Sequence, residues 1–340
     1  MERSNEEMSS TERAPTTHTQ RAAARRIAGA PISWGVCEVP GWGTQLPPER
    51  VLAEMAGLGI EATELGPRGW LGADPAARLG EYGLALVGGF VPLVLHAGEP
   101  DVDDAARMLA AAGADVFVAA LVMDDGWSPP APLDDGQFAT LVANLADAER
   151  RVAAHGLTFA LHPHAGTLAE TAADVERLLA ATGVGWCLDT GHLLIGGADP
   201  VAFASDHGER VVHVHLKDVD AAVAARYRAG ELDLLGATRA GLFRPLGRGD
   251  AQIADVLAAL DAHGYAGRYV LEQDVALDGE PPAGTGPAAD VAASLAFLGP
   301  GGPPVVPRAR RRIGAGVIGF GWLGRAHARS LARIPQLFAD

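Results

Sequence analysis

Four apolar segments of the chain each end in side chains of the kind that bind metals, and they recur at a nearly constant interval. Asp189 follows His162 by 27 residues, and His215 follows Asp189 by 26. A unit of one strand and one helix takes roughly 30 residues when about 250 residues form eight such units. The interval therefore predicts imidazoles and carboxylates at the ends of neighbouring parallel strands. The four segments are residues 159–164, 186–192, 211–218 and 269–274.

Short apolar runs alternate with Ala/Leu-rich stretches from residue 27 onward, a pattern typical of βα units and a parallel sheet. Eight strands are expected, which is the number of a (β/α)₈ TIM barrel, and such barrels build their active sites at the carboxyl ends of the strands. The expected helices include residues 48–58, 136–155 and 290–298. The expected strands are residues 27–34, 61–65, 85–91, 116–122, 158–161, 185–188, 211–216 and 269–271.

The barrel is expected over residues 27–298, with a different composition on either side. Residues 1–26 are rich in Ser, Thr, Glu and Arg, which predicts a disordered tail. Residues 299–312 read as a Pro/Gly/Arg linker. Residues 313–340 contain the GxGxxG turn Gly319-Phe320-Gly321-Trp322-Leu323-Gly324 after a short strand and resemble the opening of a Gfo/Idh/MocA-type oxidoreductase. A second strand and the acidic residue for a ribose are missing, so we expect an incomplete Rossmann βα unit that binds no cofactor, left by a truncated fusion or a gene-boundary error.

The net charge of −15 narrows the range of partners. Phosphate backbones need a basic face, so a nucleic-acid partner is not expected, and small molecules and metal cations are favoured. No apolar run reaches the roughly 18 residues of a membrane span. Only Cys37 and Cys187 are present, which predicts reduced thiols in a cytoplasmic protein. A homo-oligomer is compatible with these properties.

The polar side chains at the strand ends form a mixed nitrogen and oxygen set. Burying that many ionisable groups is costly unless they are paired or bound to a metal. Carboxylates with imidazoles suit a divalent cation, and imidazole favours Mn²⁺ or Co²⁺, with Zn²⁺ or Mg²⁺ as the alternatives. Cys187 lies one residue inside its strand end and is expected to pack in the core.

Six motifs carry a family resemblance. They are Pro31-Ile32-Ser33-Trp34-Gly35, Glu64-Leu65-Gly66-Pro67, His162-Pro163-His164-Ala165-Gly166-Thr167, Asp189-Thr190-Gly191-His192, His213-Val214-His215-Leu216-Lys217-Asp218 and Glu272-Gln273-Asp274. Together they resemble the xylose-isomerase-like TIM-barrel superfamily over residues 27–298. Within it they are most similar to the inosose dehydratases, which remove water from 2-keto-myo-inositol in inositol catabolism. The resemblance implies a hydro-lyase acting on this or a close keto-cyclitol through an enediolate.

The same resemblance implies a set of metal ligands. Three would be Asp189, His215 and Glu272, and the fourth would come from the fifth strand. Sugar epimerases and hydroxypyruvate isomerases of the superfamily carry a Glu at that place, whereas His162 stands here. His162 is the expected fourth ligand, with His164 and Glu170 as the other candidates.

A dehydratase needs a base for the proton next to the ketone and an acid for the departing hydroxyl. Glu272 or a nearby imidazole is the expected base, and His192, His164 and Lys217 are the expected acids. We also expect three contacts to the substrate. Trp34 would supply an apolar wall, Glu64 would bind hydroxyls, and Arg248 would act from the Gly/Arg-rich residues 243–250 that cover the barrel mouth.

Three other functions are alternatives to the dehydratase. The main alternative is a sugar or sugar-phosphate isomerase or epimerase, or a hydroxypyruvate-isomerase-like enzyme, which uses the same enediolate but returns the proton to carbon. A zinc AP endonuclease of the superfamily would need an Asp-x-His where Phe243-Arg244-Pro245 stands, and the acidic surface disfavours DNA. A barrel retained only as a sensor or scaffold is expected to have lost ligands, yet Asp189, His215 and Glu272 are all present.

Overall fold

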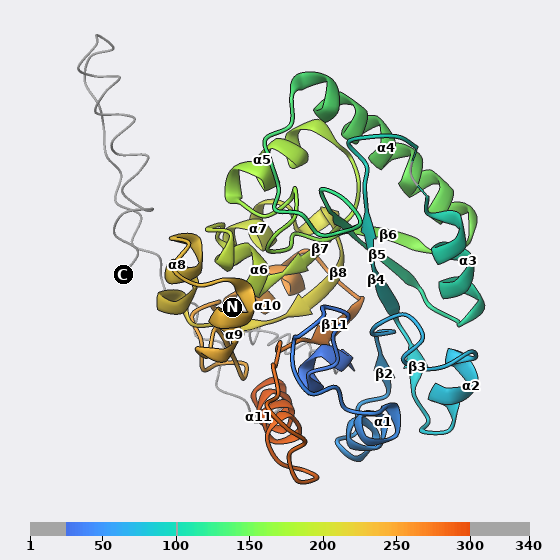
Figure 1. The fold of residues 1–340 in the computed structure, drawn as a ribbon, viewed down its shortest axis with the longest axis vertical. Helices are drawn as coiled ribbons and strands as arrows, with labels where there is room; N and C mark the ends of the chain where they lie inside the picture. The colour runs from blue at the N-terminus through green and yellow to red at the C-terminus, as the bar shows by residue number, and fades with distance from the viewer. Residues whose placement is uncertain (1–24, 100, 300–340) are drawn as a thin grey trace, which may run out of the picture. The chain divides into compact units, whose positions relative to one another are not determined.

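The computed structural model describes residues 25–99 and 101–299, and within them nine parallel strands form a nearly closed barrel with helices outside it (Figure 1). Neighbours around the sheet follow the order β3-β2-β1-β11-β8-β7-β6-β5-β4. The predicted TIM barrel is therefore confirmed. The strands are β1 (Arg26–Gly29), β2 (Ala62–Thr63), β3 (Ala85–Leu86), β4 (Gly88–Leu93), β5 (Val116–Leu121), β6 (Thr158–Leu161), β7 (Trp186–Asp189), β8 (Val211–Leu216) and β11 (Arg268–Leu271).

The two edges of the sheet, β3 and β4, are consecutive parts of the chain, in the segment predicted as the single strand 85–91. Its first part, β3, pairs with β2, and its second part, β4, pairs with β5. Val87 is the joint, because its N–H donates to Thr63 O at 2.9 Å while its carbonyl accepts from Val116 N at 3.0 Å. A Cβ on Gly88 would lie 2.6 Å from Val116 O, so only glycine allows this close approach.

The first expected strand, residues 27–34, is shorter in the structure. It begins at Arg26 and ends at Gly29, and the 3₁₀ helix η1 (Pro31–Trp34) follows. Pro31 fixes its own φ and has no N–H to donate, so it ends the ladder of strand hydrogen bonds. Gly35, with φ 78°, closes the turn in the left-handed region.

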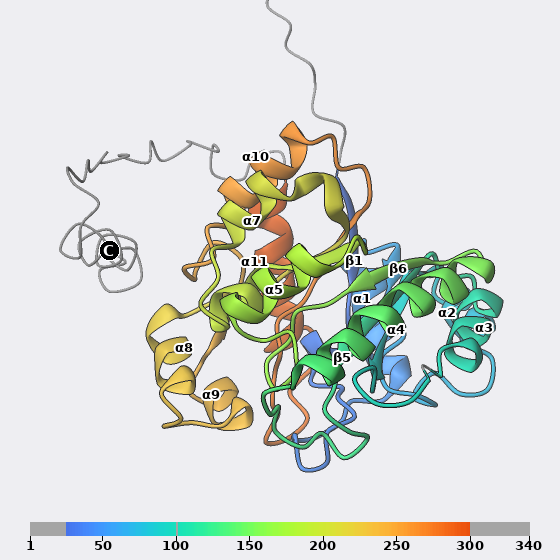
Figure 2. The same cartoon turned by 90° about the horizontal axis from the view of Figure 1, so that it is seen from above.

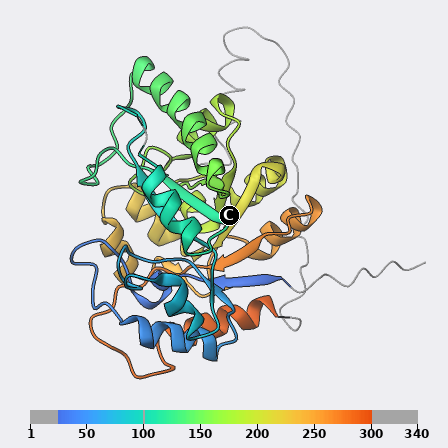
Figure 3. The same ribbon diagram turned by 90° about the vertical axis from the view of Figure 1, so that its right-hand side faces the viewer.

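The predicted helices begin and end close to where the sequence places them. Prolines open α1 (Pro48–Gly57) and α11 (Pro287–Leu298), and a capping box of Asp134 and Gln137 opens α4 (Asp135–Ala154). Figure 3 shows α1 in blue beside α11 in red-orange, below the blue strand β1. The other helices outside the barrel are α2 (Pro75–Gly80), α3 (Asp103–Ala111), α5 (Ala172–Ala181), α6 (Thr190–Ile195), α7 (Pro200–Asp206), η2 (Gly208–Arg210) and α10 (Ile253–Ala262).

The long segment after β8 forms a small unit of its own. Strand β9 (Asp218–Val219) pairs antiparallel with β10 (Phe243–Arg244), and α8 (Ala221–Arg228) and α9 (Leu234–Arg239) lie between them in sequence. Figure 2 shows α8 and α9 next to one another, away from α1 to α4. An apolar cluster holds the unit together, with Val219, Ala224, Ala237, Leu242 and Phe243 among its buried members.

Asp218 fixes the loop that returns from this unit to the barrel. Its carboxylate is 1% exposed and accepts four backbone N–H groups. One oxygen, Oδ2, accepts from Gly247 and Gly249 at 2.8 and 2.9 Å, and the other accepts from Val219 and Ala251. Such acceptors satisfy buried amide groups that have no partner in the sheet.

No helix in the described ranges is both long enough and apolar enough to cross a bilayer. The predicted disordered tail lies outside the described residues except for its last two, of which Arg26 begins β1. The predicted Rossmann βα unit lies wholly outside them.

The Asp218 hydrogen bonds predict a stability effect. In Asp218→Asn an amide NH₂ replaces one carboxylate oxygen and faces two backbone donors. We expect this to lower the free energy of unfolding by roughly 2–4 kcal/mol, since each unsatisfied buried group costs about 1–3 kcal/mol. Urea denaturation measures the change. Asp233→Asn is the control, because Asn and Asp are equivalent N-caps for α9. Equal stability of the two variants would contradict the argument.

Candidate active site

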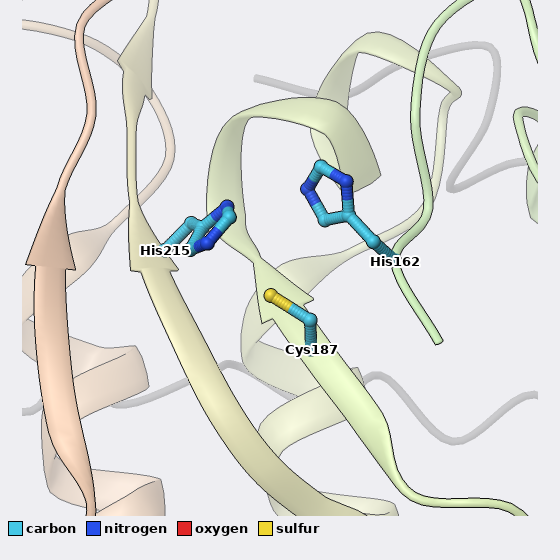
Figure 4. A group of neighbouring side chains, drawn as sticks. All are labelled: His162, Cys187 and His215. Atoms are coloured by element: carbon cyan, nitrogen blue, oxygen red, sulfur yellow. The ribbon is translucent and has the colours of Figure 1, made fainter. Parts of the chain in front are cut away.

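The period of the strands brings the predicted polar residues to one face of the sheet. Successive side chains of a strand point to opposite faces, so His162, Asp189, His215 and Glu272 share the face of the residue two positions before each. Those residues are Ala160, Cys187, His213 and Val270, all of them buried. Figure 4 shows the Cys187 Sγ directed toward the space between the His162 and His215 rings. Three of these four residues, Ala160, Cys187 and Val270, are small and leave room inside the barrel for imidazoles such as those of His213 and His215.

Asp189, His215 and Glu272 converge as the sequence predicts, with one atom of each within 4.8 Å of the others. His215 Nδ1 lies 3.4 Å from Asp189 Oδ2 and 3.2 Å from Glu272 Oε2. It is buried and yet makes no hydrogen bond of good geometry with either oxygen. His162 Nε2 is 3.1 Å from Asp189 Oδ2, so its ring lies beside this group of three. Two carboxylate oxygens and the unpartnered Nδ1 of His215, with a second imidazole beside them, are a donor set that fits a divalent cation.

Two further groups of side chains share His215. One is His162, Cys187 and His215, and the other is Glu64, His213 and His215. Burial raises the pKa of the Cys187 thiol to about 11, which agrees with its predicted role in packing. Burial opposes the charge on Glu64, but His215 and His213 outweigh it and hold the pKa of this carboxyl well below its usual range.

Lys217 is the only lysine of the chain, since the other 26 of its 27 basic residues are arginine. Its ammonium lies 2.8 Å from Asp274 Oδ1, 3.0 Å from Glu272 Oε2 and 3.7 Å from Asp189 Oδ2. Burial opposes its charge, but the three carboxylates outweigh burial and raise the pKa of Lys217 well above its usual value. Lys217 is thus held in its charged form within a buried anionic cluster.

His192 and His164 lie beside this cluster as neutral rings. The Lys217 ammonium faces His192 Nε2 at 3.1 Å, and Ala165 N–H faces His192 Nδ1 at 3.2 Å. Burial lowers the pKa of His192 well below its usual value, and His164 and Lys217 add to the effect. Burial also lowers the pKa of His164, whose Nδ1 donates to Ala165 O at 2.7 Å. His164 therefore keeps its lone pair on Nε2.

An aromatic wall that sequence reasoning missed stands next to the histidines. It consists of Phe90 and Trp127, whose rings stack with centroids 6.0 Å apart. Phe90 lies 5.8 Å from the His162 ring, and Trp127 lies 6.1 Å from the His164 ring. Trp127 has φ 56°, a conformation that costs energy outside glycine and is concentrated at functional sites. The sequence signal that could have indicated Trp127 is the Gly126-Trp127 pair in the long loop after a strand.

The three predicted substrate contacts are placed differently by the structure. Trp34 is wrong as a substrate wall, because it is fully buried in the core and its Nε1 donates to Glu54 Oε2 at 2.8 Å. Glu64 is also buried, and its carboxylate accepts hydrogen bonds from His213 and His215 where substrate hydroxyls were expected. Arg248 is exposed. Its segment does reach the site, through Phe243, whose ring centroid is 5.3 Å from Lys217 Nζ.

Comparisons with known proteins agree with this architecture. A family model described as "Xylose isomerase-like TIM barrel" matches residues 100–298. The chain is 34% identical over 264 residues to the rhizopine catabolism protein MocC of Rhizobium meliloti, covering 73% of this chain and 81% of that protein. It is 33% identical over 274 residues to an inosose dehydratase of Geobacillus kaustophilus, covering 73% and 87%.

Solved structures support the fold at lower identity. An L-ribulose 3-epimerase superposes with a TM-score of 0.58 at 20% identity, covering 91% of this chain and 97% of that one. The probable 3-DHS dehydratase AsbF of Bacillus anthracis gives 0.59 at 14%, covering 80% and 98%. The chain thus belongs to the xylose-isomerase-like TIM-barrel family and is an enzyme of that family.

Proposed function

We propose that the protein is a metal-dependent hydro-lyase that dehydrates 2-keto-myo-inositol or a close keto-cyclitol to a dione. The observation that carries the proposal is the convergence of Asp189, His215 and Glu272 beside the charged Lys217. Relatives named inosose dehydratase, which match nearly three quarters of the chain, support the reaction class.

His162, Asp189, His215 and Glu272 are the residues that would hold the cation, and Mn²⁺ or Co²⁺ suits their two imidazoles better than Mg²⁺ does. A divalent ion supplies Lewis acidity, which lowers the pKa of a proton next to a ketone whose oxygen it binds. The chain's own part is to fix the four donors at the ends of β6, β7, β8 and β11.

Two groups are able to accept the proton from carbon: Glu272, one of the proposed metal ligands, and the neighbouring His164. Glu272 is held as a carboxylate, since His215 and Lys217 outweigh burial and lower its pKa to about 2. His164 offers the lone pair of Nε2, because its Nδ1–H is directed to a carbonyl. His164 also lies against the aromatic wall of Phe90 and Trp127.

The acid for the departing hydroxyl is assigned to Lys217. His192 and His164 were also expected in this role, but burial holds both rings neutral, and for His192 the charge of Lys217 adds to the effect. An ammonium is a far stronger acid than water, so it can protonate a departing hydroxide. Three carboxylates keep this proton on Lys217 until a basic group forms next to it.

The first test is turnover. We expect the protein with Mn²⁺ to convert 2-keto-myo-inositol to a product lighter by one water, followed by mass spectrometry, and to lose this activity on exhaustive chelation. Recovery on adding back Mn²⁺ is the control for chelator damage. Full turnover without any divalent metal would contradict the metal dependence.

The second candidate function is ketose isomerisation or epimerisation, which the epimerase-like fold favours. The same incubation with a panel of ketoses separates the two. A product of unchanged mass from a ketose, with no loss of water from the inosose, would replace the dehydratase by the isomerase.

The aromatic wall predicts an effect on substrate binding. A cyclitol presents C–H groups that pack on an aromatic face, so Trp127→Ala is expected to raise KM about 3–10-fold, from roughly 0.5–1.5 kcal/mol of contact, with a smaller change in kcat. Steady-state kinetics on the inosose measures the split. A loss confined to kcat would place Trp127 away from the bound substrate.

If Lys217 is the acid, a positive charge at this position is not sufficient for activity. Lys217→Arg keeps a cation near the carboxylates but replaces a compact donor by a planar one, so we expect kcat to fall at least about 100-fold. Lys217→Met leaves buried carboxylates without a counter-ion and should cost about 3–5 kcal/mol of unfolding free energy. Arg226→Met, which breaks an exposed pair with Glu231, is the matched control and should change stability by less than about 1 kcal/mol. A Lys217→Arg variant with full activity would contradict the acid role.

A further inference from the structure

Glu64 follows β2 and ends inside the barrel against the back of the proposed metal site. Its side chain is 5% exposed. One oxygen, Oε1, accepts the Nε2–H of His213 at 2.8 Å and the Nε2–H of His215 at 3.0 Å. The opposite nitrogen of His215, Nδ1, is the one that faces Asp189 and Glu272. His215 is thus held from behind while its other nitrogen points at the two carboxylates.

We propose that Glu64 is a positioning residue for metal binding: its carboxylate keeps the proton of His215 on Nε2, so that Nδ1 faces Asp189 and Glu272 with its lone pair free for the cation. This inference rests on the proposed function, because it assigns Glu64 to the same cation. An imidazole ligand whose second nitrogen is bonded to a carboxylate is fixed in both tautomer and orientation. Glu64 acts through His215 and does not touch the substrate.

The contacts favour a charged acceptor at this place. The hydrogen bonds described for the Glu64 carboxylate come from two imidazoles that are each 1% exposed. A buried carboxylate is tolerated when it is hydrogen-bonded to such partners. Bonds to an ionised acceptor are roughly twice as strong as neutral ones, so the carboxylate holds His215 more firmly than an amide would.

His213 is a second donor to the same oxygen, and its ring packs edge-on against His215 with centroids 5.1 Å apart. Its Nε2 lies on the Glu64 side. Removing His213 leaves the bond from His215 to Glu64 in place, whereas removing the carboxylate breaks both bonds. The two residues therefore separate a positioning effect from a general effect on packing.

A second metal at Glu64, His213 and His215 is the competing explanation of the cluster. The separations of 2.8 and 3.0 Å are those of N–H···O hydrogen bonds. A metal on His215 Nε2 would replace the proton that makes the shared bond. The number of ions bound per chain distinguishes the two arrangements.

The experiment measures Mn²⁺ binding to the full chain by calorimetry for wild type, Glu64→Gln, Glu64→Leu and His213→Leu. We expect one ion per chain and a loss of affinity of about 10–100-fold in Glu64→Leu, with a smaller loss in Glu64→Gln, whose amide oxygen still accepts. His213→Leu should lose less than about tenfold. Glu61→Gln, which changes an exposed carboxylate three positions earlier, should bind as wild type does.

A spectroscopic measurement accompanies the affinities. Nitrogen NMR of ¹⁵N-histidine protein should show a protected His215 Nε2–H in wild type and His213→Leu that is lost or exchanges rapidly in Glu64→Leu. The visible spectrum of bound Co²⁺ should shift in Glu64→Leu and stay unchanged in Glu61→Gln. If Glu64→Leu does not fold, Glu64→Gln decides by the same measurements.

The outcomes keep this inference apart from the proposed function. Wild-type affinity in the folded Glu64 variants, with wild type binding one Mn²⁺, would overturn the positioning role and leave the metal-dependent function standing. Two ions per chain, with the second lost in His213→Leu, would overturn it in favour of a second metal. A wild-type chain that binds neither Mn²⁺ nor Co²⁺ would overturn the proposed metal chemistry and the positioning role together.

Discussion

The structure depends most on how charges are buried at the carboxyl end of the barrel. Lys217 lies among Asp189, Glu272 and Asp274, and none of these four side chains is more than 10% exposed. Each alone would be too costly to keep charged in such a place. Because their charges compensate one another, the site can be dry and still hold ionised groups, which strengthens every electrostatic interaction within it.

The barrel makes room for this cluster by the choice of residues beneath it. Ala28, Ala62, Ala160 and Val270 are small side chains in the buried inner clusters. Their size leaves space for the imidazoles of His213 and His215 where larger aliphatic residues commonly fill a barrel. One constraint thus joins fold and chemistry, since alternation along each strand fixes which residues share the interior.

Much of this was readable from the sequence. The interval between His162, Asp189 and His215 predicted the strands, and their parallel order predicted that their polar carboxyl ends would meet. The splitting of the expected third strand was not readable, because both halves are apolar and only the pairing of Val87 with both neighbours separates them. Trp34 was predicted as a substrate contact because a Trp after a strand suits a pocket and a core equally well. In the structure, Pro31 begins a 3₁₀ helix, and the Trp34 side chain of this helix is buried in the core.

Two features of the site were not predicted, and they share a physical reason: the contact of Glu64 with His213 and His215, and the place of Trp127 in the aromatic wall. Glu64 and Trp127 acquire their surroundings from parts of the chain far away in sequence, and no local pattern marks a contact between Glu64 and residues 149 and 151 positions later. Lys217 was predicted from its motif, but the motif does not show that three carboxylates from two other strand ends surround its ammonium. In a chain that otherwise uses arginine for every basic residue, a compact ammonium is kept at the one place where a guanidinium would have to fit between Phe243 and these carboxylates. Because an ammonium is compact and a guanidinium is a planar fork, the size of the cation as well as its charge bears on how it reaches these carboxylates.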